Sequence, residues 1–249
     1  MSTATTIIHL QGEAPEAIER ALEAIFAREG RARALQVEGT YSAVLERATS
    51  PDLDVAYRYL LLRPRPTGWT PLLELGLRAE GLDIELSLAL GGATMVAVFQ
   101  YGEVVSGYRV IRQGVEIDRY LSDPTAFEGD DAGVVASGEA RRPLSSEDIE
   151  AARGRPERFA DLLPAETAPG AFAQVVLRPG WWEERDAGDS DATGAADESG
   201  EVELVDEVDR ARCIGLALEL WAPDDYPLAG DLEDVPNAVA GPAIALAWE

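Results

Sequence analysis

The chain has 249 residues, a formal net charge of −25 at pH 7 and a pI near 4.3. This charge argues against binding to nucleic acid or to anionic membranes, because the long-range field repels polyanions. It favours basic proteins or cations as partners. All 21 basic residues are arginine, which indicates codon bias in a GC-rich genome or adaptation to salt. Either explanation makes the charge a property of the source organism and weakens a functional inference from it.

The size and the 46% of apolar residues are sufficient for one large domain, or two small ones, with a proper core. Cys213 is the single cysteine, so no intramolecular disulfide forms and a reducing compartment fits. It lies in an apolar run, and we interpret it as a small buried residue rather than a catalytic thiol. His9, the only histidine, is interpreted as a packed strand residue. No signal peptide or membrane-spanning run is evident, so we expect a cytoplasmic protein.

Strands and helices alternate in the first part of the chain. Residues 4–10 predict a strand, and Pro15 begins a helix that continues to about residue 29, with Gly30 as its C-terminal cap. Ile18, Leu22, Ile25 and Phe26 follow helical spacing within it. Further extended segments are predicted over residues 33–38, 53–63 and 69–77.

Residues 82–90, LDIELSLAL, fit two interpretations. Their alternation of apolar and polar residues is typical of a strand. Leu, Glu and Ala are helix formers, however, and Leu82, Leu86 and Leu90 also share one stripe of a helix. We predict a helix, because β-branched and aromatic residues mark the strands elsewhere in this chain.

Residues 94–121 predict an antiparallel meander of three strands, interrupted at Gly102 and Gly114. Two-residue loops at Gly102-Glu103 and Gln113-Gly114 predict the cross-strand pairs Tyr101–Val104, Phe99–Ser106, Val110–Ile117 and Arg109–Asp118. In this register one face buries Met95, Phe99, Tyr101, Tyr108, Val110, Ile117 and Leu121, and the other carries Arg109, Glu116 and Asp118. We expect Tyr120 to cover the gap left by Gly107.

The second half of the chain is more polar. Ser145 or Ser146 is expected to cap a helix, and residues 156–163 to form a second one. The acidic composition of residues 183–209 predicts a flexible loop or linker. Residues 214–221 and 238–248 are expected to pack back onto the main domain as strands. The resulting prediction is an α+β domain over residues 1–182, the acidic linker 183–209 and a C-terminal segment 210–249, with the meander in a larger mixed or antiparallel sheet and helices on one side.

Catalytic and metal-binding signatures are weak. Residues 189–200 approach the pattern of a calcium loop, but Gly200 occupies the position that requires a bidentate Glu, so we interpret them as a solvated linker. Carboxylate pairs such as Asp118 with Asp123, or Glu116 with Asp118, are expected by chance in so acidic a chain. No phosphate loop or nucleophile elbow is present. We expect no cofactor and no bound metal.

Four segments together resemble an uncharacterised family of bacterial α+β proteins. They are WTPLLE, ELSLALGG, the meander VAVFQYGEVVSGYRVIRQGVEIDRYLSDP and GRPERFADLLP. The meander ends in the pattern formed by Gly114, Asp118, Arg119, Tyr120, Ser122 and Pro124. The family has no assigned chemistry, so the resemblance implies the helix over residues 82–90 and no activity.

Three functional hypotheses follow. The leading one is a non-enzymatic adaptor or immunity-type protein that binds a partner, favoured to be basic, through Arg109, Asp118 and Tyr120 or through the acidic loop. The adjacent Trp181 and Trp182 are further candidate anchors, because interface energy concentrates on such residues. The second is an enzyme with carboxylate acid/base residues near the meander, Asp118 or Asp123 acting as base. The third is an acidic mimic of nucleic acid.

Overall fold

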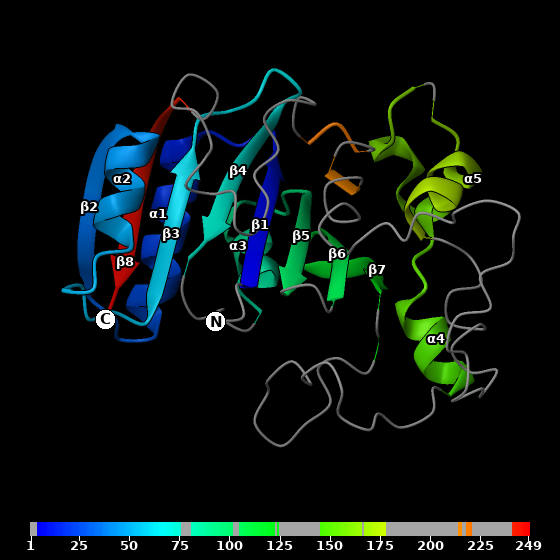
Figure 1. Ribbon diagram of the computed structural model, residues 1–249, viewed down its shortest axis with the longest axis horizontal. Helices are drawn as coiled ribbons and strands as arrows, with labels where there is room; N and C mark the ends of the chain where they lie inside the picture. The colour runs from blue at the N-terminus through cyan, green and yellow to red at the C-terminus, as the bar shows by residue number, and fades with distance from the viewer. Residues whose placement is uncertain are drawn as a thin grey trace, which may run out of the picture.

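The computed structural model describes residues 4–75, 81–101, 105–122, 124, 145–165, 167–177, 214–215, 218–220 and 241–249. Within these residues, eight antiparallel strands form one sheet in the order β2-β8-β3-β4-β1-β5-β6-β7 (Figure 1). The strands are β1 (Ala4–Gln11), β2 (Arg33–Thr40), β3 (Tyr57–Leu62), β4 (Trp69–Glu74), β5 (Met95–Tyr101), β6 (Val105–Arg112), β7 (Val115–Leu121) and β8 (Pro242–Trp248). The helical segments are α1 (Pro15–Arg28), α2 (Tyr41–Ala48), α3 (Leu82–Ala89), α4 (Ser146–Ala152), η1 (Pro156–Leu162), α5 (Pro169–Phe172) and η2 (Ala173–Leu177).

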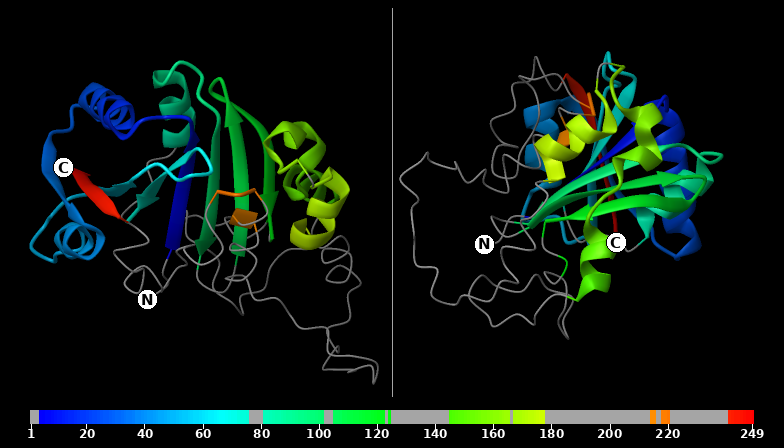
Figure 2. Two further views of the ribbon diagram at one scale, coloured as in Figure 1. Left: turned by 90° about the horizontal axis from the view of Figure 1, so that it is seen from above. Right: turned by 90° about the vertical axis from the view of Figure 1, so that its right-hand side faces the viewer.

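Both faces of the sheet are buried, because successive strand residues point to opposite sides and each side has its own apolar cluster. In β1, Ile7 belongs to one cluster and Ile8 to the other. Helices α1 and α3 cover the face of Ile8, whereas α2, η1 and α5 contribute to the cluster on the face of Ile7 (Figure 2). The α+β class and the antiparallel sheet are therefore confirmed, but helices lie on both sides of the sheet rather than on one.

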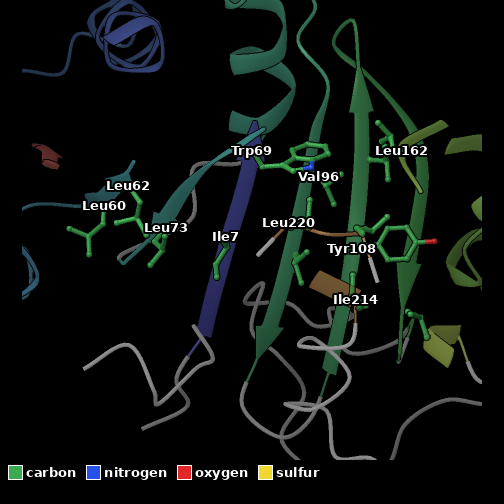
Figure 3. Close-up of a cluster of buried hydrophobic side chains, with 14 of the residues drawn as sticks. Ile7, Leu60, Leu62, Trp69, Leu73, Val96, Tyr108, Leu162, Ile214 and Leu220 are labelled. Atoms are coloured by element: carbon green, nitrogen blue, oxygen red, sulfur yellow. The ribbon is translucent and has the colours of Figure 1, made fainter. Parts of the chain in front are cut away.

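The face of Ile7 carries the cluster drawn in part in Figure 3. It joins residues that are distant in sequence, among them Trp69 of β4, Tyr108 of β6 and Ile214. Ile214 and Gly215 are helical and residues 218–220 form a turn and a bend, so the strand expected over 214–221 is wrong for its described residues. The apolar pattern correctly indicated burial, but short apolar runs do not by themselves distinguish a strand from a helix.

The local helix signals are confirmed. Pro15 occupies the first turn of α1, where a missing N–H is tolerated, and the helix ends before Gly30, whose φ is 76°. Residues 82–89 form helix α3, with Leu82 and Leu86 buried against the sheet. Ser145 caps α4 in a capping box, since its hydroxyl accepts a hydrogen bond from the N–H of Asp148 and the Asp148 carboxylate accepts one from the N–H of Ser145.

The second hairpin of the meander has the predicted loop. Arg112 pairs with Val115, which leaves Gln113 and Gly114 as the two connecting residues. Their φ values are 53° and 71°, and positive φ at both central residues is the geometry that matches the twist of a hairpin.

The first hairpin differs from the prediction by one residue. Tyr101 pairs with Val105, so three residues connect the strands rather than two. Phe99 therefore opposes Gly107, and not Ser106, while Tyr108 lies on the other face. Because a slip of one residue exchanges the two faces of a strand, the expected single core face is divided between both sides of the sheet.

A β-bulge separates Val110 and Ile111 in the pairing of β6 with β7. Val110 opposes Asp118 and Ile111 opposes Glu116, which leaves Ile117 without an opposite residue. The predicted pairs Val110–Ile117 and Arg109–Asp118 are therefore wrong. The predicted pairing of β6 with β7 is correct between the loop and the bulge, and it is shifted by one residue on the far side of the bulge.

The C-terminal strand β8 lies inside the sheet, between β2 and β3. Its pairing extends from Trp248 opposite Tyr57 to Ala243 opposite Leu62, and Trp248 also opposes Arg33 of β2. The indole of Trp248 is fully buried and stacks on Phe26 of α1 with ring centroids 4.5 Å apart. This strand joins the C-terminal residues to β2, β3 and α1, and it contributes side chains to the clusters on both faces of the sheet.

We expect Trp248→Ala to lower the free energy of unfolding by about 3–5 kcal/mol, because a fully buried aromatic ring is replaced by a cavity. Chemical denaturation followed by circular dichroism measures this. Leu88→Ala is a suitable control, since Leu88 is 59% exposed and its truncation should change stability by less than about 0.5 kcal/mol. Equal effects of the two substitutions would contradict the packing described for β8.

Candidate functional site

Among the predicted site residues, Asp118 has the most constrained surroundings. It lies in β7 and is 4% exposed. Its Oδ2 accepts hydrogen bonds from the hydroxyl of Tyr108, at 2.9 Å, and from the backbone N–H of Arg155, at 2.8 Å. The guanidinium of Arg158 lies 3.9 Å from Oδ1. Asp118 thereby ties strand β6 to the segment that connects α4 to η1.

Burial raises the pKa of Asp118, because removing the carboxylate from water disfavours its charged form. The hydrogen bonds from Arg155 and Tyr108 and the nearby charge of Arg158 act in the opposite direction without cancelling the effect of burial. The pKa of the Tyr108 hydroxyl is raised by burial and by the neighbouring Asp118, so Tyr108 remains a hydrogen-bond donor.

A small polar pocket of about 90 Å³ opens beside Asp118. Its lining consists of Glu116, Ile117, Asp118, Arg119, Glu150, Ala151, Gly154, Arg155 and Arg158. The three carboxylates and three guanidinium groups in this list balance in charge. Arg155 pairs with Glu150, and Arg119 pairs with Glu116 at 2.8 Å. A pocket of this size is large enough for water and presents no excess charge of either sign.

Gly154 allows the backbone to approach Tyr108 closely at the inner wall of the pocket. Its φ is 67°, and a Cβ at this position would lie 2.6 Å from the Tyr108 hydroxyl oxygen. The backbone conformation and the lack of space both favour glycine here.

Arg109 lies on the opposite face of the sheet from Asp118. Its guanidinium pairs with Asp83 of α3 at 2.8 Å and with Glu116 at 2.5 Å. Burial opposes ionisation of Glu116, but hydrogen bonds from Arg119 and Arg109 outweigh this and hold the pKa of Glu116 below its usual value. Arg109 thus fastens α3 to the sheet, and it does not share a surface with Asp118.

Tyr120 is buried, with 1% of its surface exposed, and its ring lies 5.9 Å from that of Tyr108. It does not cover Gly107 with its ring. Instead the ring of Phe99 lies over that glycine, with a carbon 2.7 Å from the position of a Cβ. The expected exposed face of Arg109, Asp118 and Tyr120 is therefore not formed.

Three of the predicted candidates cannot be placed, because the pair Trp181 and Trp182, the acidic residues 183–209 and Asp123 lie outside the described residues. His9 is fully buried in β1, and burial together with the charge of Arg65 lowers its pKa to about 3. It is a neutral packed residue, as its place in the first strand predicted.

The two edges of the sheet differ. The outer side of β7 is covered by a bridge from Tyr120 to Arg153, and the backbone carbonyl of Ile117 accepts a hydrogen bond from Arg158. At the other end, β8 is the only strand that pairs with β2 among the described residues, and β2 is the outermost element in Figure 1. Sequence reasoning identified β2 as a strand but carried no signal that it ends the sheet.

No protein-family model, curated protein or solved structure matches this chain. The resemblance to an uncharacterised bacterial family therefore rests on the quoted residues alone and stays a prediction. In the part of the chain that the structure describes, no helix is long and apolar enough to cross a membrane. Within the same residues, no group of three or more His, Cys, Asp or Glu side chains is arranged to hold a metal ion.

We expect Asp118→Asn to gain stability relative to the native chain as the pH rises from about 4 to about 7. The raised pKa means that the folded state binds the Asp118 proton more tightly than the unfolded state does. The stabilisation from that proton is present at low pH and is lost as the pH rises through the raised pKa, whereas Asn does not titrate. Denaturant unfolding at several pH values measures the difference.

Asp161→Asn is the control with the opposite sign, because the hydrogen bond from Arg112 lowers the pKa of Asp161. Its carboxylate stabilises the fold above its usual pKa and loses this effect as the pH falls, so the Asn variant should lose stability relative to the native chain as the pH rises. If the two variants show the same pH dependence, the surroundings described for Asp118 are incorrect.

Proposed function

We propose that this protein binds an extended segment of another protein, which adds to the sheet as a further strand beside β2. The single observation that supports this function is that, in the described part of the chain, no further strand pairs with the outer edge of β2. An exposed sheet edge presents a row of backbone N–H and C=O groups, and partner segments bind to such rows by continuing the hydrogen-bonded ladder.

The length of β2 favours this function. Its eight residues, Arg33–Thr40, extend for about 26 Å, which is long for an edge strand. Natural edges are usually protected by proline, by lysine or by a covering loop. The strand contains no proline, and its bulge between Arg33 and Leu35 affects only its first residues.

The opposite edge provides the contrast. There α4 and η1 pack against β7, and contacts from Arg153 and Arg158 occupy its backbone. Among the described residues, contacts protect the β7 edge and no further strand pairs with the β2 edge, which is consistent with a use for the β2 edge.

The pocket beside Asp118 is the observation that favours the alternative, an acid–base enzyme, because perturbed carboxyl groups gather at active sites. We favour binding, since both hydrogen bonds to Asp118 come from groups that hold β6 and η1 together. The mimic hypothesis requires ordered rows of carboxylates, and the segment richest in them lies outside the described residues.

We expect ten-residue peptides selected on the purified protein from a displayed random library to slow amide hydrogen exchange within residues 33–40. New backbone hydrogen bonds protect the amides that donate them, so the effect should be confined to alternate residues of β2. Exchange measured by NMR resolves this pattern. The amides of β7 are the internal control and should be unchanged.

N-methylation of the selected peptide provides a second control. Methyl groups on the amides that face β2 should abolish binding, whereas methyl groups on the intervening amides should be tolerated, because only one set donates across the ladder. Protection of residues 116–119 or 150–158 in place of β2 would overturn the proposal and favour the pocket.

A further inference from the structure

We infer that the segment received by β2 carries arginine or lysine at alternate positions, with apolar residues between them. The inference rests on the strand addition proposed for β2 and specifies the chemistry of the partner. It follows from the different character of the two faces of β2.

The face of β2 that lies over α1 carries excess negative charge. Arg33 pairs with two carboxylates of α1, Glu19 at 2.9 Å and Glu23 at 2.6 Å. Gln36 also donates a hydrogen bond to Glu19. Glu38, on the same face, is exposed and makes no ion pair within the described residues. These four side chains, one arginine and three glutamates, carry a net charge of −2.

The other face of β2 is apolar. Leu35 and Val37 are partly buried and pack against the cluster that α2 also covers. Both contact neighbours on the β8 side, where they oppose Ala247 and Ala245. A further strand beside β2 would extend this apolar surface with its own side chains.

Side chains of an added strand would alternate between the two faces of the sheet, so the two faces of β2 favour different residues at alternate positions of the partner segment. Residues of the added strand that point toward α1 lie beside Gln36 and Glu38, where opposite charge across the ladder is favourable. The intervening residues lie beside Leu35 and Val37, where apolar pairs are favourable. The partner segment is therefore basic on one side and apolar on the other.

A second copy of this chain fits the edge less well. It would bring another Glu38 and another acidic α1 next to the first, and the two molecules each carry a net charge of −25. Like charges across an interface disfavour association, whereas a basic segment is attracted by the same field. Charge complementarity thus selects a basic partner over self-association.

The test uses two ten-residue peptides that differ only at alternate positions, one with arginine and one with glutamate at those positions. Their affinities are measured by calorimetry on the full chain, and exchange of the β2 amides locates binding. Glu38→Arg reverses the charge on β2, and Glu147→Arg is the matched control, because it changes the net charge equally on α4 at the far end of the sheet.

We expect the arginine peptide to bind at least about tenfold more tightly than the glutamate peptide, and E38R but not E147R to remove most of this difference. Equal affinities with protection of β2 would overturn the inference and leave the strand addition intact. An equal loss of preference in E38R and E147R would also overturn it, since net charge alone would then be responsible. If neither peptide protects β2, the proposed function fails as well, and a dimer joined through β2 in sedimentation would identify the second copy as the occupant.

Discussion

The insertion of β8 between β2 and β3 is the constraint on which this fold depends. β2 pairs with β8, and β8 with β3, so β2 joins the sheet only through residues from the end of the chain. Closing so long a loop costs entropy, and the burial of the alanine-rich strand PAIALAW with Trp248 offsets it. The small side chains of β8 allow α2 to lie close to the sheet there. The open edge at β2 is thus a product of the longest-range pairing in the described chain.

Helices and apolar clusters cover both faces of the sheet, and this explains which structural features could be predicted from the sequence and which could not. Signals that act within a few residues were sufficient: Pro15 at a helix start, the Ser145 cap and the Gln113-Gly114 loop all occur as predicted. The meander was expected to have one apolar and one polar face, but β5 and β6 are buried on both. In such strands nearly every residue is apolar or paired, so alternation no longer fixes the register. One extra residue in the first loop and one bulge at Ile117 then redistribute the side chains.

The candidate site shows the same limit. Asp118 was identified from the sequence as a site residue, but its partners Tyr108 and Arg155 come from β6 and from the segment after α4. The bulge turns Asp118 toward the buried face, away from Arg109, and no local pattern carries this information. The status of β2 as an edge was also inaccessible, because it depends on which strand lies beside it and not on its own residues. Its alternating composition, half apolar and half polar, fits a strand at any position with one exposed face.

The charged residues of this acidic chain are paired differently at the two ends of the sheet. At β7, Arg119 of the strand itself pairs with Glu116, whereas Arg155 and Arg158 lie against Glu150 and Asp118, so charges are matched and the backbone edge is covered. At β2, Arg33 pairs with two carboxylates of α1, and within the described residues Glu38 makes no ion pair and no further strand pairs with the outer backbone edge. If the charge of the chain served only the general needs of its organism, the two ends would have no reason to differ. Matched charge coincides with the closed edge and excess charge with the open one, which connects the negative surface to the strand where a partner would add.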